Sequence, residues 1–303
     1  MAILARSVRQ PGGRRPTALA SAERTLQYAL LLAALVVTAA PFVWMCLSAF
    51  KPDSDLQFYP PNWVPTSWTT LNLETAWSAA NFGRFFANST FVASVGTCFY
   101  LATTMLAGYA FARLDFPWRN GLFAFVLLLL MIPWPVTIVP AYVVVVRFPL
   151  FGGNDLLGRG GVGMLDSYWA LILPVATGSF GVFLFRQFFR TLPPELEDAA
   201  RIDGASEPAI LWHVMAPLSG PAIAAVGILH FQGVWNSFLW PYLVTNNADL
   251  FVLQVGLRML TSQYNPRPFV QMAGTLIATV PVVLIFLVGQ RWFVRGIQLT
   301  GLK

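Results

Sequence analysis

The sequence predicts an all-α integral membrane protein whose single domain crosses the bilayer six times. Of its 303 residues, 56% are hydrophobic and only 11% are charged, and the mean hydropathy is +0.62. Soluble domains carry charges on about 25% of their residues. The apolar residues also gather in separate runs of the length that crosses hydrocarbon, roughly 17 to 25 residues. Composition and run length together indicate a bundle of membrane helices with short connections.

Polar breaks separate the six runs and set the expected domain limits. Residues 1–25 are rich in Arg, Gly, Pro and Ala, which predicts a disordered basic tail. The membrane domain is expected over residues 26–293, followed by a short tail at 294–303. The first run is too long for the apolar part of a cleaved signal peptide, so we interpret it as a retained helix. The predicted spans are Leu26–Phe50, Phe85–Phe111, Leu122–Val146, Tyr168–Phe185, Leu218–Leu239 and Phe269–Val288.

Basic residues are divided unequally between the two sides of this predicted bundle. With six spans both chain ends lie on one side, and the segments there hold 13 Lys and Arg residues against 6 on the other side. An excess of Lys and Arg marks the cytoplasmic side of a membrane protein. We therefore expect both termini, and the polar segment 192–217, to face the cytoplasm.

The segment 192–217 is polar where its surroundings are apolar, and its residues predict a helix, a tight turn and a second helix. Pro193 and Pro194 suit a first helical turn, where the missing N–H has no partner in any case. Gly204 favours the left-handed conformation that ends many helices. Ser206 is then expected to cap a second helix.

A resemblance rests on the residues of this segment. Asp198, Ala199 and Ala200, then Asp203, Gly204 and Ala205, then Val214 and Pro217, fall at the spacing of the EAA loop of ABC importer membrane subunits. Asp198 and Ala216 depart from the usual Glu and Leu. The resemblance implies that Glu197 to Ala205 form a cytoplasmic coupling helix that sits in a cleft of the ATP-hydrolysing subunit, with Pro217 closing the motif. The alternative is a solvated hairpin between two membrane helices.

The resemblance extends over most of the chain. SAFKPDSDL, AGYAFARLDFPWRN, MIPWPVTIVPAYVVV and WNSFLWPYLV are similar to the smaller, maltose-type permease of carbohydrate ABC importers. It implies a type I importer permease fold in the cytoplasmic membrane of a bacterium or archaeon. The closing tail, with Gly296, Gly301 and Lys303, resembles a tail that reaches toward the ATPase dimer. A frayed terminus is the alternative.

The same resemblance implies the partners and the mechanism. They are a second, non-identical permease, two ABC ATPase subunits and an extracytoplasmic solute-binding protein. ATP and Mg would be held by the ATPase subunits, and this chain would bind no cofactor. Closure of the ATPases would move the coupling helices together and open the central path to the binding protein.

Several classes of chemistry are excluded by the residues themselves. A P-loop needs a Lys that follows a Gly, whereas Lys51 and Lys303 follow Phe50 and Leu302. An HExxH metal site cannot be built from two isolated histidines, and no nucleic-acid-binding face is apparent because the basic residues are dispersed. We therefore predict no catalytic residue and no metal site. A secondary transporter of a small polar solute is the alternative, although no span holds the charged residue that usually couples such transport.

Candidates for a substrate path are aromatic and amide residues, the types that hold sugars in small-molecule pockets. For the tryptophans an interfacial belt is the alternative, and for the amides a bond between helices. The histidine at membrane depth is either functional or bonded to a helix carbonyl. The candidates are Trp134, His230, Trp235, Asn236, Trp240 and Gln271.

Overall fold

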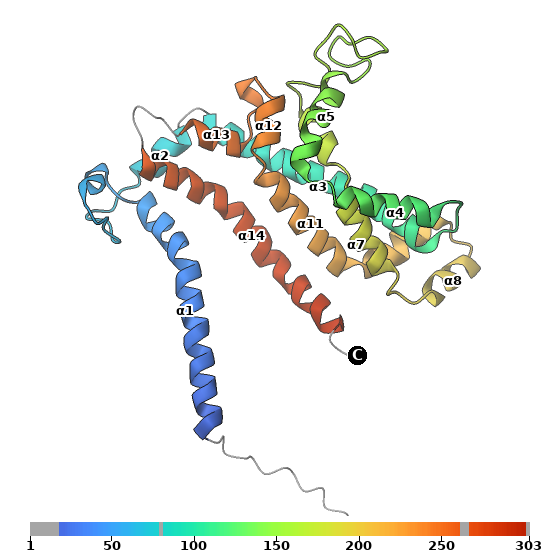
Figure 1. Ribbon diagram of the computed structural model, residues 1–303, viewed down its shortest axis with the longest axis horizontal. Helices are drawn as coiled ribbons and strands as arrows, with labels where there is room; N and C mark the ends of the chain where they lie inside the picture. The colour runs from blue at the N-terminus through green and yellow to red at the C-terminus, as the bar shows by residue number, and fades with distance from the viewer. Residues whose placement is uncertain (1–17, 79–80, 261–266, 301–303) are drawn as a thin grey trace, which may run out of the picture.

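Helix α3 (Phe82–Arg113) is the axis of an elongated helical bundle. The computed structural model describes residues 18–78, 81–260 and 267–300, and every regular element in these ranges is helical (Figure 1). α3 packs against α7 (Ser179–Phe189) and α11 (Gly220–Trp235). Its buried residues recur every three or four positions, which places them on one face. The predicted all-α fold is confirmed.

The contact between α3 and α7 depends on a close backbone approach. A Cβ atom at Gly108 of α3 would lie 2.6 Å from the Cβ atom of Phe185 and 3.0 Å from the backbone nitrogen of Arg186. Only a glycine fits there, because both neighbours are fixed parts of α7. This approach brings the end of α3 beside the end of α7, where the segment 192–217 begins.

Three helices are long and apolar enough to cross a membrane: α1 (Ala18–Ala49), α3 and α14 (Pro268–Thr300). Three bent pairs bring the number to six if each pair is one span. One pair joins α6 and η3 (Tyr168–Ile172 and Leu173–Val175) to α7 at 42°, and another joins the segment Glu207–Leu218 to α11 at 83°. The six-span prediction therefore agrees with the fold, although half of the spans are not straight.

The span predicted at Leu122–Val146 is present as a bent pair of helices and not as one straight helix. The structure divides it into α4 (Arg119–Leu130) and α5 (Trp134–Val146), which meet at 106°. Pro133 and Pro135 explain the break, since proline cannot donate a helical hydrogen bond and disfavours helical conformation in the residue before it.

Both ends of the membrane domain extend beyond their predicted limits. α1 begins at Ala18, so residues 18–25 are helical, whereas we expected a disordered tail; residues 1–17 lie outside the described ranges. α14 continues to Thr300, so most of the expected tail 294–303 belongs to that helix. Hydropathy falls at these ends, but Ala and Glu in 18–25 and Arg and Gln in 291–300 are good helix formers.

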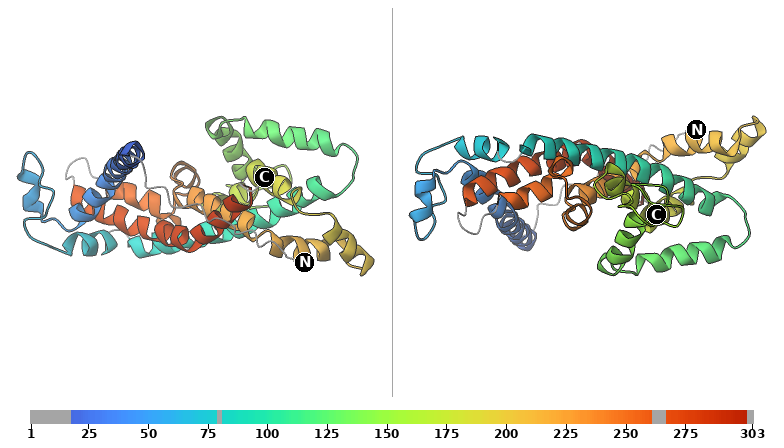
Figure 2. Two further views of the ribbon diagram at one scale, coloured as in Figure 1. Left: turned by 90° about the horizontal axis from the view of Figure 1, so that it is seen from below. Right: turned by 90° about the horizontal axis from the view of Figure 1, so that it is seen from above.

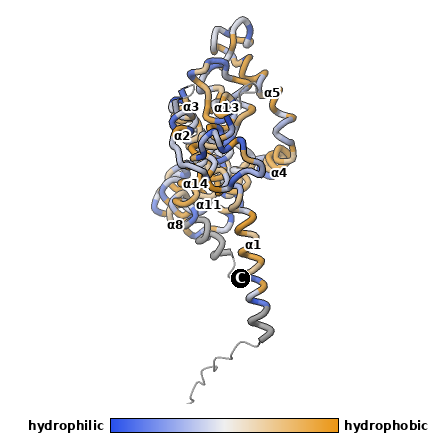
Figure 3. The backbone as a smooth tube through the Cα atoms, turned by 90° about the vertical axis from the view of Figure 1, so that its left-hand side faces the viewer, coloured by the Kyte–Doolittle hydropathy of each residue, from blue (hydrophilic) through white to orange (hydrophobic). Residues whose placement is uncertain are grey.

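Helix α1 stands apart from the rest of the bundle. It packs against α14, and its Leu, Val and Phe side chains are largely exposed; Figure 3 shows it as an apolar rod leading away from the other helices. Figure 2 shows α3 and α14 running along the length of the molecule. The shorter elements are η1 (Asp53–Gln57), α2 (Leu71–Ser78), α12 (Leu239–Val244), η5 (Ala248–Leu250) and α13 (Leu253–Met259).

Candidate functional site

The segment 192–217 folds as the predicted helix, turn and second helix. α8 spans Glu195–Ile202, and Gly204 follows with φ +82°, the left-handed region that suits glycine. α9 (Glu207–Ile210) follows, then a π-helical turn at Leu211–Met215 and α10 (Ala216–Leu218). Ser206 occupies the N-cap position, but its side chain makes no capping hydrogen bond. Pro208 removes one of the N–H groups that such a side chain binds.

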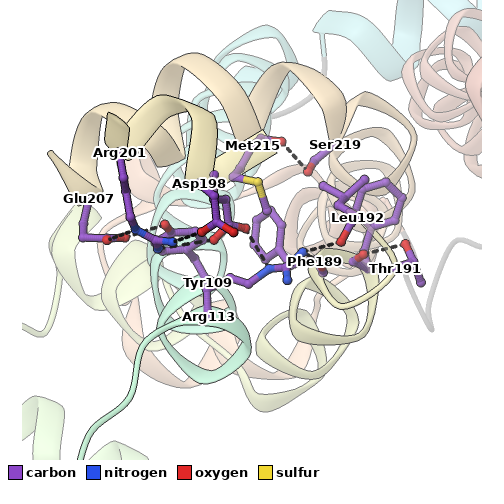
Figure 4. A network of polar contacts seen from close by, with 12 residues as sticks. Tyr109, Arg113, Phe189, Thr191, Leu192, Asp198, Arg201, Glu207, Met215 and Ser219 are labelled. Atoms are coloured by element: carbon purple, nitrogen blue, oxygen red, sulfur yellow. Dashed lines mark hydrogen bonds and ion pairs between the residues drawn. The ribbon is translucent and has the colours of Figure 1, made fainter. Parts of the chain in front are cut away.

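A buried ion pair fastens α8 to the end of α3. The Arg113 Nε atom lies 2.8 Å from Oε1 of Glu197, a residue with only 2% of its surface exposed. Arg113 Nη2 also donates to the carbonyl oxygens of Phe189 and Leu192, each at 2.6 Å (Figure 4). Burial raises the pKa of Glu197, and the positive charge of Arg113 opposes that shift. One guanidinium therefore joins α3, the end of α7 and the segment 192–217.

A second arginine joins the two helices of the segment. Arg201 Nε donates to Oε1 of Glu207 at 3.0 Å, and its Nη1 donates to Asp198 at 3.2 Å. The Tyr109 hydroxyl of α3 donates to the other Glu207 oxygen at 2.6 Å. Hydrogen bonds from Arg201 and Tyr109 lower the pKa of Glu207. Figure 4 shows these residues in one network, so the segment is a preformed unit on α3.

The outward face of the segment carries most of the predicted coupling residues. Asp198, Ala199, Asp203, Gly204 and Pro217 are exposed, while Ala200 and Ala205 are half-buried against the cluster around Phe189 and Ile210. Glu197 does not lie on this outward face, because its side chain is buried against Arg113 of α3. Sequence reasoning missed Ile202, which is 87% exposed at the end of α8. An isoleucine among charged helix residues is the signal that marks it. Gly296 lies on α14, and Gly301 and Lys303 lie outside the described residues.

A cavity of about 590 Å³ opens beside α3, α5 and α11. It brings together three of the six substrate-path candidates, Trp134, His230 and Trp240. The rings of Trp134 and Trp240 meet edge to face, with centroids 6.0 Å apart. Sequence reasoning missed other lining residues, because none stands in a motif; they include Tyr100, Phe180 and Ser237.

Two hydrogen bonds and one ring contact fix the imidazole of His230. Its Nε2 atom lies 2.9 Å from the carbonyl oxygen of Val175, so this nitrogen carries the proton, and Nδ1 then accepts from the Thr97 hydroxyl at 3.0 Å. The ring stacks on Tyr100 with centroids 3.8 Å apart. The bond to a carbonyl, one of the two alternatives for this residue, is confirmed. His230 is thus a lining residue of the cavity whose ring is fixed by these three contacts.

The other three candidates lie away from this cavity. Trp235 is buried and donates Nε1–H to the carbonyl oxygen of Ala278 at 3.0 Å, a contact between α11 and α14. Asn236 and Gln271 are exposed, and Asn236 is 3.4 Å from the amide of Gln254. Within the described residues, no group of three or more His, Cys, Asp or Glu side chains is arranged to hold a metal ion.

These features define a class of protein. The fold is a bundle of membrane-length helices that presents a charged helix–turn–helix segment at one end. The chain belongs to the binding-protein-dependent transport system inner membrane components, whose family model matches residues 101–299. It is thus a permease subunit of an ABC importer.

Individual relatives agree with this assignment. The arabinooligosaccharide transport system permease AraQ of Halalkalibacterium halodurans is 33% identical over 270 residues, covering 88% of this chain and 92% of the relative. The sn-glycerol-3-phosphate transport system permease UgpE of Yersinia enterocolitica is 34% identical over 278 residues, covering 89% and 94%.

The fold agrees as well. A bacterial ABC transporter that imports alginate matches with a TM-score of 0.77 at 18% identity, over 93% of this chain and 100% of the other. The bacterial alginate transporter in complex with an alginate pentasaccharide-bound periplasmic protein matches with a TM-score of 0.62 at 17% identity, over 88% and 93%.

Proposed function

We propose that this chain is one of two non-identical permeases of an ATP-driven importer for a sugar, an oligosaccharide or a related polyol. Its relatives are named for arabinooligosaccharides and sn-glycerol-3-phosphate, and its structural neighbours for alginate. All these solutes carry hydroxyl groups on a short carbon chain or a sugar ring. A cavity walled by Trp134 and Trp240 suits them, because aromatic faces and a few polar groups hold such ligands.

The outward face of the 192–217 segment is the proposed contact with the ATPase. The observation that carries this proposal is Ile202, an apolar side chain with 87% exposure beside the exposed Asp198 and Asp203. An apolar anchor with a charged rim is typical of protein interfaces. Two ATPase subunits would hold ATP and Mg, and a solute-binding protein would deliver the solute to the opposite side. Both termini would then be cytoplasmic.

Co-purification with the partner subunits tests the contact. Ile202→Asp changes one exposed side chain and no described internal hydrogen bond. We expect the wild-type chain to bring down an ABC ATPase and a second permease, and the variant to lose the ATPase while keeping the permease. Leu157→Asp is the matched control, since Leu157 is 72% exposed in the 147–167 loop. Equal ATPase recovery with wild type and Ile202→Asp contradicts the proposal.

Thiol labelling tests the orientation. In vesicles that hold the permeases without the ATPase subunits, an Ile202→Cys variant that also carries Cys46→Ser and Cys98→Ser should react with a membrane-impermeant maleimide in inside-out vesicles and not in right-side-out vesicles. The reverse pattern would place the segment outside the cell. The cargo is then found by measuring uptake of labelled oligosaccharides and glycerol phosphate in proteoliposomes that contain the complete importer and its binding protein.

A further inference from the structure

A second, smaller cavity lies at the end of the molecule away from the 192–217 segment. It has a volume of about 210 Å³ and is lined by the last turn of α1, the chain after it and the start of α14. Figure 1 shows the end of α1 and the start of α14 at the same end of the molecule. This volume is much larger than the roughly 15 Å³ that one water molecule needs. The proposed function gives no role to its residues. Its polar lining consists of Ser48, Lys51 and Asp55, and its aromatic lining of Trp44, Phe58 and Phe269.

The ammonium group of Lys51 is buried here without a paired carboxylate. Lys51 is only 1% exposed, and its Nζ atom lies 3.9 Å from the ring centroid of Trp44. It donates to the carbonyl oxygen of Asn62, which occupies one of its three N–H groups. Among the described residues, no carboxylate lies within the 4.0 Å of an ion pair. A buried charge is costly unless it is paired.

Neither of the two other polar residues of the cavity forms an ion pair or a hydrogen bond with the Lys51 ammonium group. Both Asp55 oxygens accept hydrogen bonds from Thr66, one from its backbone N–H at 3.1 Å and one from its hydroxyl. Burial lowers the pKa of Lys51, and the more distant charge of Asp55 opposes only part of that shift. The Ser48 hydroxyl is 1% exposed and has no hydrogen-bond partner among the described residues. The cavity thus holds an unpaired cation and an unpaired hydroxyl.

The surroundings of the cavity are those of a membrane interface. Tyr59, Trp63 and Trp68, on the chain that follows α1, are 98%, 55% and 64% exposed. Tyr and Trp gather at the headgroup level of bilayers. Trp63 also packs edge to face on Trp44, with centroids 5.2 Å apart, so this aromatic layer is continuous with the cavity wall. The exposed apolar side of α1 begins next to the cavity and continues along the helix away from it.

We propose that this cavity binds the phosphate group of a membrane phospholipid, with Lys51 and Ser48 as donors and α1 as the surface for the acyl chains. A phosphodiester carries one negative charge and free oxygen acceptors, which match an ammonium and a hydroxyl. The bound lipid would fix the end of α1, whose main helix contact is with α14. This proposal does not depend on the cargo or on the ATPase contact.

Native mass spectrometry of the intact transporter, released from detergent, tests the proposal. The wild-type chain should retain one phospholipid, and Lys51→Met should retain it at least about tenfold less, a change of about 1.4 kcal/mol. The matched control is Arg84→Gln. Arg84 lies in the first turn of α3 and forms an exposed ion pair with Asp249, so its replacement removes a surface cation and should leave lipid retention unchanged. Ser48→Ala, a smaller change, should weaken retention in the same direction and guards against misfolding of Lys51→Met.

Competition separates the two sources of phosphate. Inorganic phosphate or glycerol phosphate at millimolar concentration should not displace the lipid, because neither has acyl chains to contact α1. Displacement by either one would assign the cavity to a soluble phosphate and overturn the lipid proposal. Equal lipid retention by wild type, Lys51→Met and Ser48→Ala would overturn it as well.

Discussion

The Arg113–Glu197 ion pair is expected to hold the segment 192–217 on the bundle, and its removal should release the segment. The Arg113→Met variant leaves Glu197 buried, with Arg201 Nη2 at 3.5 Å as its remaining cation. Removal of one partner from a buried pair costs roughly 3–5 kcal/mol. Glu197→Gln keeps the shape and leaves Arg113 with two carbonyl acceptors, so its cost should be smaller, about 1–3 kcal/mol.

Amide hydrogen exchange over residues 192–217 in the assembled transporter measures this release. A loss of about 3 kcal/mol corresponds to roughly a hundredfold larger open population, since every 1.4 kcal/mol is a factor of ten. Arg113→Met should therefore exchange much faster than wild type, with Glu197→Gln in between. Solute uptake per ATP hydrolysed should fall in the same order, because a loose lever transmits less motion to α3.

A double variant and a surface control make the test strict. Arg113→Met with Glu197→Leu replaces the pair by apolar groups and should recover part of the protection, because neither charge remains buried alone. Arg119→Gln removes a cation from the exposed pair with Asp115, 2.7 Å away, and should have an effect under about 1 kcal/mol. Unchanged exchange in both Arg113→Met and Glu197→Gln would refute the idea that this pair fastens the segment.

Three further predictions follow from the structure. Gly108→Val should prevent close packing of α3 on α7 and abolish assembly, measured by size-exclusion chromatography, whereas Gly220→Ala, where an added Cβ would meet nothing within 4 Å, should assemble normally. Trp134→Ala should reduce uptake several-fold with assembly intact, because the cavity loses an aromatic wall, and Trp118→Ala, at an 84% exposed position outside the cavity, should not. The lowered pKa of Glu207 means that its bonds to Arg201 and Tyr109 stabilise the segment above the ordinary pKa of a glutamate and stop doing so as the pH falls through the lowered value. Hydrogen exchange of α9 should accelerate at that acid pH in wild type and show no such step in Glu207→Gln.

Local signals in the chain were sufficient for the membrane class and for the 192–217 segment. Composition and run length indicate membrane helices, and Pro194 and Gly204 fix the ends of α8 through backbone preferences that need no distant partner. The break at Pro133 had the same kind of signal, but the apolar run around it concealed the bend.

Only the tertiary structure decided which neighbouring side chains face inward. Glu197 and Asp198 are adjacent acids on one short helix, yet the first is buried on Arg113 and the second is exposed. The difference depends on how α3, distant in sequence, packs against the segment. The same holds for Trp235 and Trp240, of which one bonds to α14 and the other lines the cavity with Trp134. A sequence pattern assigns residues to a helix, but the contacts between helices decide which side chains are buried, which are exposed and which line the cavity.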